Sequence, residues 1–181
     1  EFELALRECG VPFQLVNGVE FFHRKEIKDV LAYLQLLNNP RDDMALLRVI
    51  NVPPRGIGKA TLERLSDHAA RHGLTLLDAA RTCRDIKSIN DRAATLVTRF
   101  VGLFDRLAAL LDAPIEEILG YVLSETGYQE ALEKSESVED QERLANIEEL
   151  LTVAREFDEQ SSGQRRLEEF LEETSLTGDT D

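Results

Sequence analysis

Apolar residues recur every three or four positions along most of the chain, which is the pattern of amphipathic helices. The clearest case runs from about His23 to the stop at residues 38–40, which read Asn-Asn-Pro. Ile27, Leu31 and Leu34 share one face of this predicted helix, and we expect its charged residues on the opposite, solvated face.

Further helices are predicted over residues 44–52 and 59–73, on either side of a turn that contains two glycines. Later helix starts are marked by capping residues or by proline. The marks are Thr75 with Asp78, Ser88 with Asp91, Pro114, and Ser137 with Asp140. The helix after Ser88 is expected to continue to Leu111, and a last helix carries Leu167 and Phe170.

The first residues predict a different kind of structure. An apolar helical pattern begins at Glu1 without an N-cap and ends at Cys9-Gly10, and residues 13–16 are typical of a short strand. Because one strand needs partner strands that this sequence does not supply, we expect a segment cut from a larger protein. The predicted fold is all-α, a helical bundle with a small N-terminal α/β stub.

The stretch from Ile50 to Glu63 reads INVPPRGIGKATLE and cannot lie inside a helix or a strand. Its two prolines remove backbone donors, and its two glycines allow backbone angles that other residues avoid. A glycine turn that leads into a helix exposes unpaired N–H groups at the positive end of the helix dipole. The sequence therefore predicts a phosphate-sized site here.

Nearby side chains strengthen this prediction. Arg55 and Lys59 supply positive charge, and Thr61 offers a hydroxyl in the first turn of the helix. The alternative is an ordinary tight turn, with glycines for steric reasons and cations for solubility. A nucleotide-binding P-loop is excluded, because Pro53 and Ala60 stand where that motif needs glycine and Ser or Thr.

The net charge of -14 is distributed unevenly. Residues 1–110 contain 16 Lys and Arg against 14 Asp and Glu, and residues 111–181 contain 5 against 21. The first part therefore carries +2 and the second -16, so a cationic turn can face away from the acidic helices.

Other candidate sites are weak. His68 and His72 have the spacing of two metal ligands, but no third ligand accompanies them, so no metal site is predicted. Cys9 and Cys83 are expected to be free thiols in the cytoplasm. The many glutamates are expected to form a solvated face, and no catalytic residues and no membrane segment are predicted.

Two motifs resemble those of UvrD/Rep-type superfamily 1 DNA helicases. The run from Gly18 to Leu34 is similar to their GGxxFFxRxEIKDxLAYL motif. The run from Arg48 to Gly58 resembles their RIINxPxRGIG segment. Residues 39–43 match the NPxDD link between them, and residues 143–150 resemble RxENxxEL, with Ala145 in place of Glu. The residues that carry the first motif are Phe21, Phe22, Arg24, Glu26, Lys28 and Asp29.

The resemblance implies that residues 1–40 are a stub of the RecA-like motor subdomain 2A. Residues 41–181 would then be the helical accessory subdomain 2B, which touches duplex DNA at a single-strand/double-strand junction. It assigns the backbone contact to Gly56, Ile57, Gly58 and Thr61, with Arg55 and Lys59 as supporting cations. It also implies that ATP and Mg²⁺ bind elsewhere in the parent helicase, that this fragment holds no cofactor, and that it is inactive alone.

Two alternatives stay open. The acidic helices from Ile115 onward could form a protein-docking and autoinhibitory module, and the parent protein could be a nuclease-fused relative of these DNA repair helicases. The remaining motor subdomains of the same chain are partners in either case. Only phosphate-backbone contact is expected, without sequence-specific reading of bases.

Overall fold

The computed structural model describes residues 19–160 and 166–178. Every regular element in these ranges is a helix, which confirms the all-α prediction for this part of the chain. The predicted N-terminal helix, the strand over residues 13–16 and therefore the α/β stub lie outside the described residues.

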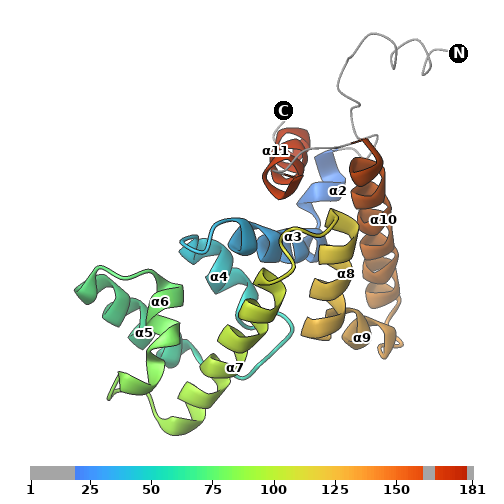
Figure 1. Ribbon diagram of the computed structural model, residues 1–181. Coiled ribbons are helices and arrows are strands. Elements are labelled where there is room, and N and C mark those ends of the chain that lie inside the picture. The colour runs from blue at the N-terminus through green and yellow to red at the C-terminus, as the bar shows by residue number, and fades with distance from the viewer. Residues whose placement is uncertain (1–18, 161–165, 179–181) are drawn as a thin grey trace, which may run out of the picture.

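The helices form two groups that meet at α3 and α7 (Figure 1). α5 and α6 lie on one side, and α8 to α11 lie on the other. The elements are α2 (Val19–His23), α3 (Lys25–Asn38), α4 (Asp43–Val49), α5 (Lys59–His72), α6 (Leu76–Arg81), the 3-10 helix η1 (Cys83–Asp85), α7 (Asp91–Ala108), α8 (Ile115–Thr126), α9 (Tyr128–Glu133), α10 (Val138–Gln160) and α11 (Arg166–Gly178).

α3 is the centre of the packing, because it contacts α2, α4, α7, α8, α10 and α11. The prediction that its charged residues lie on a solvated face was wrong for Glu26 and Asp29, which are 6% and 4% exposed. The sequence pattern could not reveal this, because the polar side of α3 is covered by other helices, α4 next along the chain and α10 far from it, which only the fold brings together.

The buried carboxylates of α3 have polar partners, as their burial requires. The Asn146 side chain of α10 donates to Glu26 Oε1 at 2.6 Å, and Arg24 donates to the Asn146 oxygen. Arg48 of α4 donates to Asp29 Oδ1 at 2.9 Å. These contacts connect α3 to a preceding turn, to its neighbour α4 and to a helix more than 100 residues later.

The predicted helix starts are partly confirmed. Thr75 caps α6 by accepting the N–H of Asp78, as its capping box indicates. Ser88 is not a cap, because α7 begins later and the side chain of Asn90 accepts the N–H of Ala93. The same helix ends at Ala108 and does not reach Leu111.

The N-terminus of α8 follows Pro114, as predicted, and receives its cap from another helix. The Asp158 carboxylate of α10 accepts the N–H groups of Ile115 at 2.9 Å and of Glu116 at 2.8 Å. A carboxylate is stabilised in this position by the free donors and by the helix dipole. This chain therefore already contains an anion held at a helix N-terminus.

The C-terminal helices are fixed to each other by aromatic packing. Phe170 of α11 is fully buried, and its ring centroid lies 5.2 Å from that of Phe157 of α10 in an edge-on arrangement. Such pairs add to the free energy gained from burial of apolar area.

We predict that Phe170→Ala lowers the free energy of unfolding by about 3–5 kcal/mol, because it removes a buried ring and leaves a cavity. Urea unfolding followed by circular dichroism measures this change. Met44→Ala, at a side chain that is 76% exposed, is the control and should change the same free energy by less than about 0.5 kcal/mol. Equal effects of the two substitutions would contradict the packing described for α11.

Candidate nucleic-acid interface

The predicted glycine turn connects α4 to α5 and runs alongside α7 (Figure 1). Residues 50–58 contain no regular element, and the Val52–Pro53 peptide bond is cis. Gly56, Gly58, Lys59 and Ala60 are exposed, whereas Ile57 is only 3% exposed. The turn therefore presents backbone to the solvent and anchors itself with one apolar side chain.

Asn51 holds the glycine segment in shape. Its side-chain amide donates to the Ile57 carbonyl at 2.6 Å, and its side-chain oxygen accepts the Ile57 N–H at 3.1 Å. This paired contact closes the segment between the two residues much as a backbone bridge would. It also uses the Ile57 N–H, so that donor is not free for a ligand.

Arg55 points into the protein. Its Nη1 donates to the carbonyls of Val49 at 2.8 Å and Ile50 at 3.0 Å, with the Val52 carbonyl at 3.3 Å. Its Nη2 donates to the Tyr33 hydroxyl at 2.6 Å.

The same guanidinium carbon lies 5.4 Å from the ring centroid of Phe100 and 5.9 Å from that of Tyr33, in cation–π range. At the end of α4 the Val49 carbonyl also accepts the Val52 N–H, so Arg55 adds a further donor there and supplies one to the Ile50 carbonyl. In this structure Arg55 shapes the turn, a task that its charge alone did not indicate.

The N-terminus of α5 is open. No acceptor among the described residues receives the N–H of Gly58, Lys59 or Ala60, and the first internal bonds of the helix are those of Thr61 and Leu62 to the Gly58 carbonyl. By contrast, side chains of Asp42, Thr75, Asn90 and Asp158 cap α4, α6, α7 and α8.

The two glycines differ in what the fold demands of them. Gly56 has a φ of +74°, a left-handed conformation that favours glycine. Gly58 has an ordinary φ of -70°, and a Cβ added there would meet nothing within 4 Å. The fold itself therefore does not require glycine at position 58, where Ser or Asp would make a better cap.

The other predicted contact residues lie in different settings. The Lys59 side chain is 91% exposed, and its Nζ is 3.7 Å from Glu63 Oε1. Thr61 is only 8% exposed, so its hydroxyl lies largely inside. The structure thus brings Gly58 and Lys59 to the surface together, whereas Arg55 and Thr61 face inward.

The residues of the first helicase-like motif form a separate cluster around α2 and α3. Phe21 and Phe22 are buried, with ring centroids 5.1 Å apart. Lys28 is exposed and lines a pocket of about 320 Å³, together with Arg48 and Leu171 of other helices. This cluster packs against α11 and is distinct from the glycine turn.

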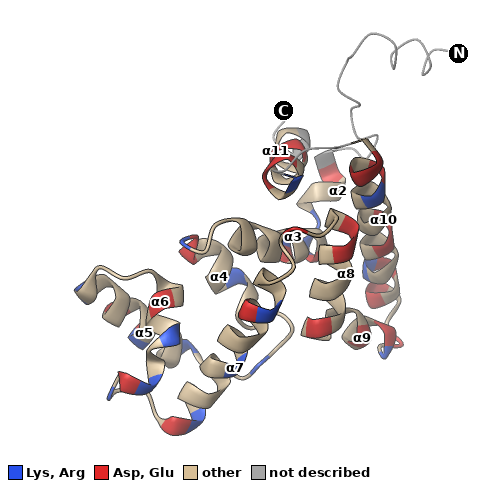
Figure 2. Ribbon diagram, viewed as in Figure 1, with Lys and Arg blue, Asp and Glu red and all other residues tan. Residues whose placement is uncertain are grey.

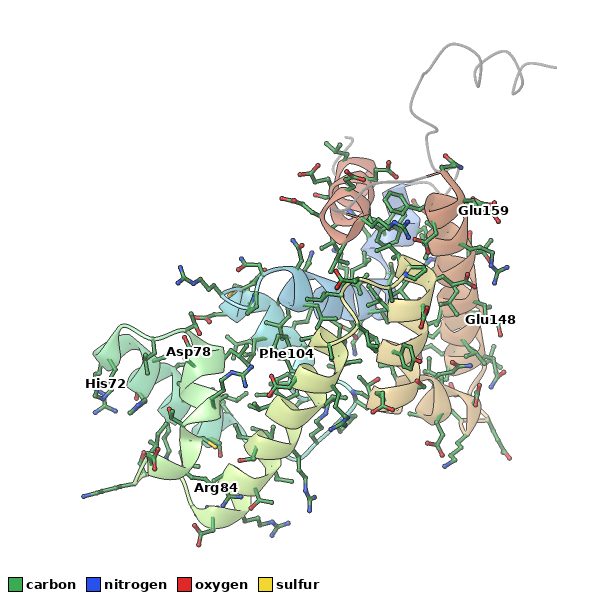
Figure 3. All side chains as sticks on the ribbon, viewed as in Figure 1. His72, Asp78, Arg84, Phe104, Glu148 and Glu159 are labelled. Atoms are coloured by element: carbon green, nitrogen blue, oxygen red, sulfur yellow. The ribbon has the colours of Figure 1, made fainter. Side chains whose placement is uncertain are left out.

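Charge is segregated along the chain, as predicted (Figure 2). The long helix α10 is acidic on its outer side, where Glu148 and Glu159 project away from the bundle (Figure 3). Three cations in the described part of this half are paired with carboxylates: Lys134 with Glu130, Arg143 with Glu139 and Asp140, and Arg155 with Glu116. The acidic surface therefore keeps its excess negative charge.

The remaining candidate residues are His68, His72 and the two cysteines. The rings of His68 and His72 stack with centroids 4.3 Å apart, but in the described ranges no group of three or more potential ligands surrounds a metal position. Cys83 is a buried free thiol, and Cys9 lies outside the described residues. None of the described helices combines the length and the apolar character that crossing a membrane requires.

We predict that Arg55→Lys lowers the free energy of unfolding by about 1–3 kcal/mol although it keeps the charge, because an ammonium cannot replace the guanidinium fork. Lys59→Gln removes a charge from an exposed site and should change the free energy by less than about 0.5 kcal/mol. Urea unfolding of both variants is the measurement. Unchanged stability in Arg55→Lys would contradict the positioning role.

The stability of the fold should depend on pH through the partly buried Tyr128. Burial, followed by the nearby carboxylates of Asp29 and Glu26, raises the pKa of Tyr128 well above its ordinary value of 10. Burial also raises the pKa of Tyr33, although Arg55 opposes that shift.

The unfolded chain ionises these tyrosines near pH 10, while the folded chain keeps their protons, so stability should be lost as the pH rises from about 10 toward the folded pKa values. We predict that Tyr128→Phe makes the free energy of unfolding less dependent on pH between 9 and 11. The same slope in the variant and the parent chain would contradict this assignment.

The chain is similar to known proteins along nearly its whole length. A family model described as the UvrD-like helicase C-terminal domain matches residues 1–181. The chain is 38% identical over 180 residues to the ATP-dependent DNA helicase PcrA of Bacillus subtilis, and 37% identical over 194 residues to the ATP-dependent DNA helicase UvrD1 of Mycobacterium tuberculosis H37Rv. It is also 33% identical over 181 residues to PcrA of Staphylococcus aureus NCTC 8325.

These matches cover 99% of the chain but only 24% of the Bacillus relative and 25% of the other two. The chain therefore spans about a quarter of the length of the curated relatives that it matches. The family match agrees with the resemblance of the two sequence motifs and with the all-helical structure of the described residues. The chain belongs to the UvrD-like helicase C-terminal domain family.

Proposed function

We propose that this chain is the accessory, duplex-contacting part of an ATP-dependent DNA helicase, and that it holds the DNA backbone at the open N-terminus of α5. The observation that carries the proposal is the group of exposed, unpaired N–H donors at Gly58, Lys59 and Ala60. The names of the relatives make DNA the natural ligand for such a site.

The chemistry suits a phosphate. The N-terminus of α5, a helix of 14 residues, offers several parallel donors and a positive dipole end, and Lys59 adds a positive charge that Glu63, 3.7 Å away, offsets in part. Glycine at position 58 removes the side chain that would otherwise cover these donors. Asp158 at α8 makes the same kind of contact within the fold, so a phosphate at α5 would take the place of a missing cap.

The contact reads no sequence. Backbone N–H groups recognise a phosphate oxygen and carry no information about the base, so they position the protein on the duplex. The turn is held by Asn51 and Arg55 before the ligand arrives, which reduces the ordering cost of binding. This combination suits a helicase, which must grip many sequences in succession.

The family resemblance suggests which part of a helicase each segment of the chain belongs to. We propose that residues 1–40 belong to motor subdomain 2A and residues 41–181 to accessory subdomain 2B, which touches the junction of single-stranded and double-stranded DNA. ATP and Mg²⁺ would bind to other parts of the intact helicase, because this sequence contains no Walker A motif. Unwinding then depends on the motor, and this segment anchors or senses the duplex.

The acidic helices favour a second candidate function. Glu148 and Glu159 project outward from α10, where the excess carboxylates would repel DNA and attract a basic surface. A protein-docking or autoinhibitory role for this face is compatible with DNA contact at α5, which comes from the other half of the chain.

We predict that Gly58→Asp lowers duplex affinity by at least about tenfold, because its carboxylate would cap the free donors and repel phosphate. The same change should leave stability equal or raise it by a few tenths of a kcal/mol, because Asp is a better cap than Gly. Fluorescence anisotropy with a tailed duplex at 50–200 mM salt measures affinity, and urea unfolding measures stability.

The matched control is Gly120→Asp, which adds the same charge to α8 at a position where a Cβ meets nothing within 4 Å. It should leave duplex affinity within about twofold of the parent chain. Equal affinity losses in the two variants would show a general charge effect and would contradict a site at α5. If the parent chain binds the duplex and both variants bind it with the same affinity, the DNA contact lies elsewhere.

A further inference from the structure

We propose that α7 carries a second phosphate-contact strip, formed by Arg92 and Arg99, which works with the glycine turn as a two-part grip on the duplex backbone. This inference rests on the proposed function and extends it to residues that neither helicase-like motif contains. The strip lies more than 30 residues beyond the turn in sequence, so only the fold can bring the two together.

The position of the strip follows from one contact and from helix geometry. A Cβ placed on Gly56 would lie 3.8 Å from Leu96 Cδ1, so the turn sits against the face of α7 that carries Leu96. Arg92 lies four residues before Leu96 and Arg99 three residues after it, and these spacings place all three on one helix face. The two arginines therefore flank the place where the turn meets α7.

Both arginines are available for a ligand. Arg92 and Arg99 are exposed, and within the described ranges neither has an ion-pair partner. No acidic residue stands three or four positions from either one, since these positions hold Ser, Ile, Thr, Leu and Gly. The arrangement is unlike that of the acidic half, where carboxylates neutralise Lys134, Arg143 and Arg155.

The strip has a defined end. Arg106 continues the seven-residue spacing, but its Nε lies 3.2 Å from Glu125 Oε2 of α8, and its Nη1 donates to the Gly102 carbonyl. It is therefore held by the protein. The free cations of this face of α7 are limited to the two that flank the turn, as expected for a local contact surface.

The dimensions suit a nucleic-acid backbone. Seven residues of α-helix rise about 10.5 Å, so Arg92 and Arg99 can reach phosphates that are not adjacent to each other. Each guanidinium can hold a phosphate through two parallel N–H groups. A duplex presents a dense row of such charges, so a grip of two arginines and one helix N-terminus would contact the backbone at several points.

The test compares three forms of the chain in binding to the same tailed duplex. Arg92→Gln with Arg99→Gln removes the strip, and Lys25→Gln with Arg41→Gln removes the same charge from exposed residues near α3. The strip variant should bind about 10- to 60-fold more weakly at 0.1 M salt, and its log–log salt slope should be smaller in magnitude by about 1.8, the value for two lost phosphate contacts. The control variant should keep the parent slope.

The possible failures are distinguishable. If the parent chain binds the duplex and Gly58→Asp weakens binding, but the strip variant keeps the parent slope, the strip is refuted and the turn contact stands. If the strip variant and the control lose affinity equally, the effect is one of net charge and the strip is again refuted. If the folded parent chain does not bind the duplex at any salt concentration, both the strip and the proposed function are refuted.

Discussion

The contact between Arg55 and the end of α4 is the interaction on which the functional surface depends. Its guanidinium joins the carbonyls of Val49 and Ile50 to the Tyr33 hydroxyl, and thereby ties the turn to the buried helix α3. With these carbonyls satisfied, the chain can leave α4, pass through two prolines and begin α5 in a fixed direction. Asn51 then closes the glycine segment, and the donors of α5 are left facing the solvent.

The helix starts of this molecule differ in how their first N–H donors are satisfied. Side-chain oxygens cover the first donors of α4, α6, α7 and α8, and at α8 this oxygen comes from Asp158 of a distant helix, whereas the N-cap residues of α3 and α9 make no such bond. At α5 the corresponding position holds Gly58, and no group in the described part of the chain takes the place of the cap. A helix start without a cap is slightly less stable than a capped one, and binding of an anion would restore this stability. Concentration of the acidic residues in the other half keeps their repulsion away from this end.

Sequence rules predicted those features of the fold that depend on residues close together in the chain. The helix of residues 25–38, the cap at Thr75 and the turn between α4 and α5 could all be inferred from periodicity, capping residues and glycine. The burial of Glu26 and Asp29 could not, because the groups that cover and satisfy them come from other helices. Arg55 shows the same limit. A cation beside a glycine turn predicts a ligand contact, and only the position of α3 reveals its inward bonds. The arginines of α7 carry no motif, and their nearness to the turn is a property of the fold alone.

We propose that the backbone donors of Gly58, Lys59 and Ala60 hold the DNA phosphate. The most direct measurement is a titration of the ¹⁵N-labelled chain with a short duplex, followed by amide chemical shifts. We expect downfield shifts of those three amide protons, because they would gain a charged acceptor, and a much smaller change at Ile57, whose N–H is already bonded to Asn51. Saturable binding of the duplex with no change at these amides, and with shifts confined to other helices, would show that the phosphate is not held at the N-terminus of α5.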